Sequence, residues 1–409
     1  MNKVFIYPSY IKSKSEISIT GSKSESNRLL IINALCSNIE LLNLSNSDDT
    51  KVLIKSLSNL NDHIDIHHAG TAMRFLTAFL AQVQNREFII TGSARMQERP
   101  IGILVDSLNE LGFDVRYLEK KGFPPLKILG KKNIKSEIKL NSNVSSQYIS
   151  ALMLIAPSLY NGLKIILEGQ IISKPYINLT LNILKKIGVN CSFKKNIIEI
   201  KKYSKSQISE YTVESDWTSA SYFYSIVSLL DNSTIVLSSF FYNSFQGDSK
   251  VSKIYESFGV NTTYKENTIR LTKMENYSKP DSLEFDLLEN PDLAQTISVT
   301  ALCLGIPLVL TGLQTLKIKE TDRIIALNNE LSKLGANVVC NDNSISITPP
   351  KKLNDYVNIK TYDDHRMALS FSPAGLITPI YIEDYNVVSK SYPDYWSDLK
   401  SIGFNIEFQ

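Results

Sequence analysis

Cysteine is scarce in this chain of 409 residues, with four cysteines at positions 36, 191, 303 and 340. They are scattered, and their spacing matches neither a set of metal ligands nor a pattern of disulfide pairs. This argues against a disulfide-stabilised scaffold and against a zinc-binding module. Reduced thiols in a reducing, cytoplasmic compartment are the simpler interpretation.

Histidine is equally scarce, with four residues. His67 and His68 adjoin a glycine-containing loop and His365 lies in an Asp-His-Arg sequence, but none has a partner at metal-ligand spacing. We therefore expect no metal site.

The chain also lacks long apolar runs. Its longest apolar stretch, residues 297–313, is interrupted by serine, threonine, glycine and proline. A buried helix, a turn and a strand explain this stretch better than a membrane span does. The first residues contain no apolar segment typical of a secretory signal.

Neither sign of charge dominates. Lys and Arg total 44 and Asp and Glu total 41, so the net charge of +3 does not by itself indicate a nucleic-acid-binding protein. With 43% hydrophobic and 21% charged residues, the composition is that of an ordinary soluble globular protein. The length favours two or more domains.

What the chain does contain is a repeated pattern, in which a short strand-like run leads into a small polar loop and then an apolar helix. The pattern occurs six times. Its last five loops are spaced by 75, 71, 76 and 72 residues, counted from Gly70, Ser145, Asp216, Asp292 and Asp364. A fixed period of this size indicates a duplicated structural unit. Each loop is predicted at a helix N-terminus, where free N–H groups and the helix dipole attract anions.

Each repeat has a second half, in which another helix ends near a glycine. The glycines expected to form left-handed helix caps are Gly112, Gly188, Gly259, Gly335 and Gly403. The pattern therefore predicts an α/β protein built from about six units of strand, helix, strand, helix and one or two further strands. The first unit is degenerate, since no glycine follows its helix near residues 53–60.

The first loop, GSKSESNR at residues 21–28, places Lys23 and Arg28 on either side of a serine-rich helix start. Such a start can bind a phosphate or a carboxylate, although the spacing is not that of a P-loop. A capped helix with solvated basic residues is the alternative.

Two further helix starts carry polar groups. Gly70 allows the backbone to approach a ligand closely. Ser145, Ser146 and Gln147 offer two hydroxyls and an amide. For the serines, a plain N-cap is the alternative.

Two carboxylates stand near predicted helix starts. Asp292 follows Pro291, where it is either a cap that compensates the helix dipole or a base that takes a hydroxyl proton. Glu320 lies three residues before Arg323, so these two side chains could simply pair on a solvated face. The residues alone leave both alternatives open.

Eight motifs occur along the chain in a fixed order. They are residues 21–28 (GSKSESNR), 69–74 (AGTAMR), 99–100 (RP), 145–147 (SSQ), 173–176 (SKPY), 319–323 (KETDR), 364–367 (DHRM) and 390–395 (KSYPDY). Over nearly the whole chain this series resembles the 3-phosphoshikimate 1-carboxyvinyltransferase family, also called 5-enolpyruvylshikimate-3-phosphate synthases.

The resemblance implies an enzyme of the shikimate pathway, which leads to the aromatic amino acids. It would transfer the enolpyruvyl group of phosphoenolpyruvate to the 5-hydroxyl of shikimate 3-phosphate. Phosphate would leave by addition and elimination through a tetrahedral intermediate, and no cofactor would be needed. The implied fold is a two-domain inside-out α/β barrel with three βαβαββ repeats in each domain. One domain would be residues 21–214 and the other residues 1–20 with 215–409, and the two would close over the substrates.

The resemblance also implies roles for individual residues. Those expected to bind shikimate 3-phosphate are Lys23, Ser24, Arg28, Ser145, Ser146, Gln147, Ser173, Tyr176, Asp292 and Lys319. Those expected to bind phosphoenolpyruvate are Lys23, Gly70, Arg99, Gln147, Arg323, Arg366 and Lys390. Asp292 or Lys23 would accept the hydroxyl proton, and Glu320 would move a proton at the enol methylene carbon.

Some positions depart from the family's usual residues. His68 stands where Asn is common, and Phe75 stands where Pro is common. Both flank the expected phosphoenolpyruvate loop. Gly70 keeps the family residue, and we expect it to leave room for the inhibitor glyphosate.

Two other functions are considered. An enolpyruvyl transferase that acts on a UDP-amino sugar would share the architecture, but that family typically uses a cysteine in a Pro-Cys loop, which is absent here. A non-catalytic anion- or RNA-binding repeat protein would need exposed basic residues with interleaved aromatics. The expected partners are therefore the two small substrates, with no nucleic acid, no membrane and a monomeric chain.

Overall fold

The structure is a computed structural model that describes residues 2–36, 38–141, 145–169, 171, 174–203 and 205–409. The chain forms two compact units. The continuous unit comprises residues 21–213, and the split unit comprises residues 1–20 together with 214–409. In the described ranges, no helix is both long enough and apolar enough to cross a membrane.

The continuous unit holds the first three repeats, and the first helix of each repeat lies inside the unit. These inner helices are α1 (Lys23–Cys36), α3 (Gly70–Ala81) and α6 (Ser146–Ile155), which contact one another. α6 carries no charged residue and is almost wholly buried, as expected of a helix that is apolar all round. The outer helices are α2 (Asp48–Ser58), α4 (Ala94–Gln97), α5 (Gly102–Glu110), η1 (Ala156–Ser158) and α7 (Lys174–Lys186).

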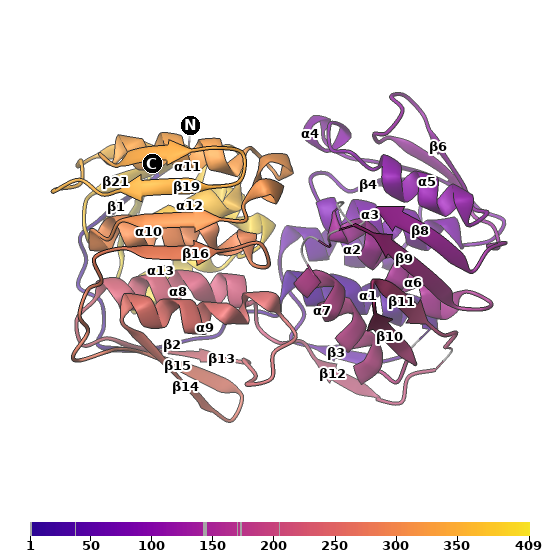
Figure 1. Ribbon diagram of the computed structural model, residues 1–409, viewed down its shortest axis with the longest axis horizontal. Helices are drawn as coiled ribbons and strands as arrows, with labels where there is room; N and C mark the ends of the chain where they lie inside the picture. Colours follow the sequence, from indigo (N-terminus) through magenta and orange to yellow (C-terminus); the bar gives the residue numbers. More distant parts are fainter. Residues whose placement is uncertain (1, 37, 142–144, 170, 172–173, 204) are drawn as a thin grey trace. The chain divides into compact units, whose positions relative to one another are not determined.

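Strands complete the continuous unit (Figure 1). They are β3 (Glu40–Leu42), β4 (His63–Asp65), β5 (Glu87–Thr91), β6 (Asp114–Tyr117), β7 (Leu126–Leu129), β8 (Glu137–Asn141), β9 (Leu163–Glu168), β10 (Cys191–Lys194), β11 (Ile197–Ile200) and β12 (Glu210–Thr212). Among the described residues of this unit they form two four-stranded sheets, β4-β5-β7-β6 and β10-β11-β9-β8, and one two-stranded sheet, β12-β3. The two-stranded sheet belongs to the first repeat, which the sequence already marks as degenerate.

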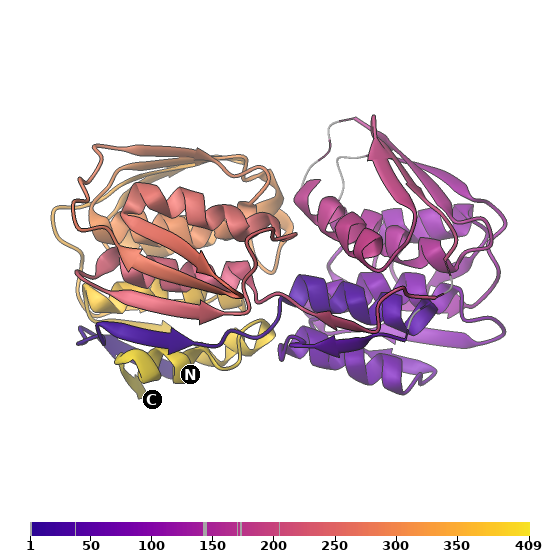
Figure 2. The same ribbon diagram turned by 90° about the horizontal axis from the view of Figure 1, so that it is seen from below.

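The split unit holds the other three repeats. Its helices are α8 (Trp217–Leu229), η2 (Gly247–Lys250), α9 (Val251–Ile254), η3 (Tyr255–Phe258), η4 (Pro291–Leu293), α10 (Ala294–Leu304), η5 (Gln314–Ile318), α11 (Arg323–Lys333), α12 (His365–Phe371), η6 (Ser372–Leu376), η7 (Tyr385–Lys390) and α13 (Tyr395–Ile402). The inner helices α8, α10 and α12 pack on their own sheets (Figures 1 and 2).

The strands of the split unit form three four-stranded sheets. They are β1 (Lys3–Tyr7), β2 (Lys14–Ile17), β13 (Thr234–Ser238), β14 (Val260–Lys265), β15 (Thr268–Lys273), β16 (Leu283–Asp286), β17 (Leu308–Thr311), β18 (Asn337–Cys340), β19 (Ile345–Thr348), β20 (Val357–Ile359), β21 (Ile380–Glu383) and β22 (Asn405–Phe408). The sheet orders are β14-β15-β13-β2, β16-β17-β19-β18 and β20-β21-β1-β22.

In the part of the chain that the structure describes, all five four-stranded sheets are built alike, with one parallel pair followed by two antiparallel neighbours. In the last repeat, β1 from the start of the chain occupies the third place of the sheet. There Val4 lies opposite Ile382 on one side, and Ile6 lies opposite Ile406 on the other. This pairing makes the N-terminal residues part of the split unit (Figure 2). The predicted α/β class is confirmed.

Two local predictions are also confirmed. The five glycines expected to cap helices all have positive φ, from 77° at Gly259 to 113° at Gly403. The interrupted apolar stretch forms the buried helix α10, a left-handed turn at Gly305 and the strand β17.

Hydroxyl side chains join the inner helices of the split unit. Thr296 Oγ1 on α10 lies 3.2 Å from Ser221 Oγ on α8, and Thr300 Oγ1 lies 2.8 Å from Ser225 Oγ. Because the partner advances by four residues on both helices, α8 and α10 run parallel. Their N-termini therefore lie at the same end of the unit.

Candidate functional site

Asp292 is the centre of a charged cluster in the split unit. It lies in η4, directly before α10, and is 7% exposed. Its Oδ1 is 2.8 Å from Nη1 of Arg323 and 3.5 Å from Nζ of Lys319. Its Oδ2 is 3.2 Å from Nη2 of Arg366. A carboxylate that only compensated the dipole of α10 would need no cations beside it. The three cations around Asp292 therefore indicate more than a helix cap.

Arg323, the first residue of α11, joins three carboxylates. Its Nη1 contacts Asp292, its Nη2 donates to Glu320 Oε2 at 2.8 Å, and its Nε donates to Asp364 Oδ2 at 2.6 Å. Burial alone would lower the pKa of Arg323, but the charges of Asp364, Glu320 and Asp292 together outweigh it and raise the pKa. Arg323 is therefore a permanent cation that holds three segments together.

The pair formed by Glu320 and Arg323 is not a solvated surface pair. The side chain of Arg323 is 2% exposed and that of Glu320 is 24% exposed. The residue that caps α11 is Asp322, whose Oδ1 accepts hydrogen bonds from the backbone N–H groups of residues 324 and 325. Asp322 thus caps the helix, whereas Glu320 pairs with the buried Arg323.

The remaining predicted residues of the split unit lie close by. Arg366, in the first turn of α12, also hydrogen-bonds the side chain of the buried Tyr222. Lys390, at the end of η7, donates to the carbonyl of Asp363 at 2.7 Å, so it lies against the loop that precedes α12. The structure thus joins five predicted residues of this unit in one cluster, Asp292, Lys319, Glu320, Arg323 and Arg366, and places Lys390 against the loop before α12.

Two acidic residues of this region were not among the predicted site residues. Asp364 caps α12 and binds Arg323, and its place in a repeated loop could have revealed it. Asp248, in η2, is 8% exposed and accepts hydrogen bonds from Thr218 and Asn290. Burial, followed by the charge of Asp292, raises the pKa of Asp248 to about 6. It lies outside the six repeated loops, so the periodicity carries no signal for it.

In the continuous unit, Lys23 opens α1. Its Nζ lies 3.8 Å from Oδ2 of Asp49, and its side chain is 19% exposed. The carbonyl of the next residue, Ser24, accepts a hydrogen bond from Nη1 of Arg28 at 2.8 Å. Arg28, one helical turn after Ser24, therefore holds the start of the loop at residues 21–28 in place.

Arg28 is 2% exposed and bonds neutral acceptors. Its Nε donates to Thr180 Oγ1 at 2.8 Å, and its Nη2 donates to Ser150 Oγ at 3.0 Å and to the carbonyl of Tyr176 at 3.5 Å. Its guanidinium lies 5.4 Å from the ring centre of Phe75. Burial lowers the pKa of Arg28 to about 10. This side chain joins α1 to α6 and α7, and Tyr176 lies beside it through its backbone.

Gly70 and Arg99 lie together. A Cβ atom added at Gly70 would lie 2.6 Å from Nη1 of Arg99, so the guanidinium rests on the glycine. The buried Arg74 donates to the carbonyl of Pro100 at 2.8 Å and to that of Gly70 at 3.1 Å. Arg74 therefore fastens the Arg99 turn to α3.

The start of α6 combines a cap with a contact to α3. Ser145 is the N-cap of α6, and its side chain accepts a hydrogen bond from the backbone N–H of Gln147 at 3.3 Å. The Gln147 amide donates to Thr71 Oγ1 at 3.4 Å, beside the Gly70 loop. Ser146 is 8% exposed. Ser173 lies outside the described residues.

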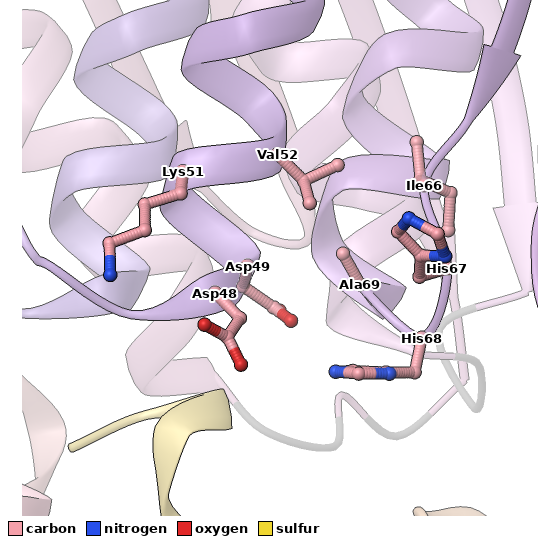
Figure 3. Close-up of a pocket in the computed structure, with 8 residues that line it drawn as sticks. All are labelled: Asp48, Asp49, Lys51, Val52, Ile66, His67, His68 and Ala69. Atoms are coloured by element: carbon pink, nitrogen blue, oxygen red, sulfur yellow. The ribbon is translucent and has the colours of Figure 1, made fainter. Parts of the chain in front are cut away.

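A cavity of about 270 Å³ lies between the start of α2 and the loop before α3 (Figure 3). It is lined by Asp48, Asp49, Lys51, Val52, Ile66, His67, His68 and Ala69. Asp49 and His68 both extend into this space in Figure 3. Since Asp49 is the partner of Lys23 and Ala69 precedes Gly70, the cavity adjoins two of the predicted loops.

The two groups of residues offer different chemistry. The split unit provides carboxylates that can take or give a proton beside several cations. The continuous unit provides hydroxyls, an amide, basic side chains and helix starts that can bind anions. In the part of the chain that the structure describes, no three histidine, cysteine or carboxylate side chains are grouped to hold a metal ion.

Comparisons with known proteins agree on one family. The family model described as EPSP synthase (3-phosphoshikimate 1-carboxyvinyltransferase) matches residues 55–399. A 3-phosphoshikimate 1-carboxyvinyltransferase of Bacteroides fragilis strain YCH46 is 48% identical over 404 residues, which cover 98% of this chain and 97% of the relative. One of Colwellia psychrerythraea is 36% identical over 423 residues, covering 96% and 97%.

A solved structure has the same fold. The EPSP synthase of Acinetobacter baumannii superposes with a TM-score of 0.81 at 21% sequence identity, with 100% of each chain covered. At this sequence identity the match shows only that the two proteins share a fold.

Proposed function

The chain belongs to the EPSP synthase (3-phosphoshikimate 1-carboxyvinyltransferase) family, and from this premise we propose which residues perform its reaction. It is a transferase of the shikimate pathway. It moves the enolpyruvyl group of phosphoenolpyruvate to the 5-hydroxyl of shikimate 3-phosphate and releases phosphate by addition and elimination.

Asp292 accepts the proton of the 5-hydroxyl. One observation carries this assignment: Arg323, Arg366 and Lys319 converge on its carboxylate. The neighbouring cations can bind the phosphate and carboxylate groups of the reactants while the carboxylate takes the proton. Lys23 is the alternative acceptor.

Glu320 supplies the proton for the enol methylene carbon. Its carboxylate is oriented by Arg323 and is partly exposed, as a group that meets a substrate must be. As the hydroxyl oxygen bonds to the second carbon of phosphoenolpyruvate, the methylene carbon takes a proton and becomes a methyl group. That methyl group then returns a proton to Glu320, the carbon–oxygen bond to phosphate breaks, and the enol ether remains.

Substrate binding is divided between the units in this proposal. Shikimate 3-phosphate is bound by Lys23, Ser24, Arg28, Ser145, Ser146, Gln147, Ser173, Tyr176 and Lys319, and phosphoenolpyruvate by Lys23, Gly70, Arg99, Gln147, Arg323, Arg366 and Lys390. The pair of Gly70 with Arg99 supports the second assignment. Arg28 acts mainly through its charge, because several of its N–H groups already bond Thr180 and Ser150.

Each unit is proposed to be one enolpyruvyl transferase domain. The chain is proposed to act as a monomer in the cytoplasm, with no nucleic-acid or membrane partner. The near-balanced charge supports the absence of a nucleic-acid partner. Light scattering of the eluting protein at several concentrations tests the monomer, and a mass that rises with concentration would contradict it.

The central experiment measures phosphate release from the two purified substrates. We expect release with shikimate 3-phosphate and none with a UDP-amino sugar. Asp292→Ala and Glu320→Ala should each slow turnover by about 10²–10⁴-fold with KM nearly unchanged. The matched control is Asp342→Ala, at an exposed carboxylate on the same unit. Normal turnover in both active-site variants would refute the assignments.

Glyphosate provides a second test of the phosphoenolpyruvate residues. With a glycine at position 70, we expect inhibition that competes with phosphoenolpyruvate. An inhibition curve that stays flat at high glyphosate concentration would show that the site does not admit it.

A further inference from the structure

We infer that Asp248 is a positioning residue for the reaction: it holds the loop that carries Asp292 against the start of α8, and its negative charge makes Asp292 a better proton acceptor. The inference rests on the proposed role of Asp292. It concerns a residue outside the repeated loops.

The position of Asp248 is set by two hydrogen bonds to different segments. The Thr218 hydroxyl, in the first turn of α8, donates to Oδ2 of Asp248. The Asn290 amide donates to Oδ1 at 3.3 Å, and Asn290 stands two residues before Asp292. One buried carboxylate thereby ties the loop of the base to an inner helix. Because the N-termini of α8 and α10 lie at the same end of the unit, this tie fixes where Asp292 stands.

The segment that carries Asp248 is itself anchored. The side-chain amide of Gln246 donates to the carbonyl of Ser215 at 2.8 Å, and its oxygen accepts from the backbone N–H of Trp217 at 3.1 Å. Lys250, on the same segment, pairs with Glu289 at the surface. Asp248 is therefore a fixed support and does not move with a flexible loop.

The charged groups that face Asp248 come from two elements. Asp292 of η4 raises its pKa, and Arg366 of α12 lowers it. The neighbouring α8 presents the Thr218 hydroxyl, while the Asp216 carboxylate of that helix caps the N–H of Ser219. Coulomb interaction is mutual, so a carboxylate that feels the charge of Asp292 also favours proton transfer to Asp292.

The test compares Asp248→Asn with Glu289→Gln. Asp248→Asn keeps the size and both hydrogen bonds, since Thr218 can accept from the new amide, but it removes the charge. Glu289→Gln removes an equal charge from the surface of the loop that carries Asp292. Thr218→Val breaks one contact and keeps the charge of Asp248, so it reports on position alone, whereas Asp248→Ala removes the contacts and the charge together.

For Asp248→Asn we expect kcat to fall by about tenfold with both KM values within about twofold. The acid limb of the kcat–pH profile should move to lower pH, because Asp292 then binds a proton less readily. Glu289→Gln should match the wild type. A purely structural residue would change the melting temperature without moving the acid limb.

Several outcomes would overturn the inference. Wild-type kcat and pH profile in Asp248→Asn would do so, as would an equal shift in Glu289→Gln. If Asp292→Asn itself keeps normal turnover, the proposed base fails. If Asp292→Asn is inactive while Asp248→Asn is normal, the base stands and the inference about Asp248 alone is wrong.

Discussion

Each unit contains a buried arginine at the first turn of a helix or one turn later, and the two arginines are stabilised in opposite ways. Arg323, in the split unit, lies among three carboxylates, and their charges raise its pKa despite burial. Arg28, in the continuous unit, bonds hydroxyls and backbone carbonyls, and burial lowers its pKa to about 10. Both side chains are 2% exposed.

The difference shows what each unit can offer to anionic substrates. The cluster around Arg323 is largely neutralised by its own acids, so it holds carboxylates ready for proton transfer. The charge of Arg28 is offset mainly by dipoles, so its field can still attract a phosphate. Proton chemistry is therefore expected from the split unit, whereas residues proposed to bind anions lie in both units.

The largest expected effect is that of Arg323→Met. Removing this cation takes one ion-pair partner from each of Asp292, Glu320 and Asp364. This should cost about 3–5 kcal/mol in the free energy of unfolding and abolish turnover. Chemical denaturation followed by circular dichroism measures it. A cost below about 1 kcal/mol would show that the carboxylates are not held by this residue.

Arg28→Met tests the other half of the comparison. It leaves two hydroxyls with fewer partners and removes a cation near the buried Glu25, whose carboxylate keeps its hydrogen bond from Tyr211. The expected cost is therefore about 1–3 kcal/mol. KM for shikimate 3-phosphate should rise more than KM for phosphoenolpyruvate. If Arg28→Met destabilised the protein as much as Arg323→Met, the distinction between dipoles and charges would fail.

Gly70→Ala examines the contact with Arg99 inside the continuous unit. The added Cβ would lie 2.6 Å from the guanidinium and must displace it. We expect KM for phosphoenolpyruvate to rise by roughly 10–100-fold with little loss of stability. Gly102→Ala is the control, because its Cβ would make contacts of 3.4 Å or longer. An unchanged KM would show that Gly70 does not contribute to binding phosphoenolpyruvate.

The smallest effect concerns the pH dependence of stability at Asp248. Its folded pKa of about 6 is above the usual value, so its contribution to stability is present below about pH 4 and is lost as the pH rises through 6. Asp248→Asn should therefore be more stable than the wild type at pH 7.5. We expect a gain of about 1 kcal/mol in the free energy of unfolding, because the neutral amide forms weaker hydrogen bonds than the carboxylate and offsets part of the benefit.

Thermal unfolding at pH 7.5 and pH 4.5 measures this difference. The advantage of the variant should shrink at the lower pH. An advantage that is the same at both values would mean that the carboxylate is not the group responsible.

Much of the fold could be predicted because local patterns carry it. The glycines that end helices, the period of the polar loops and the absence of charge from α6, α8 and α10 are all features of short segments, and each is visible in the sequence. The place of β1 was less accessible, because its partners β21 and β22 are almost 400 residues away in the chain.

The sequence by itself determined the repeated unit, the family resemblance and the residue types available for acid–base chemistry. Tertiary structure alone decided that Arg323 meets three carboxylates, that Arg28 meets hydroxyls, and that Asp248 supports the loop of Asp292. The physical reason is that charge effects depend on distance and burial in space. Residues far apart in the chain acquire these only when the helices pack.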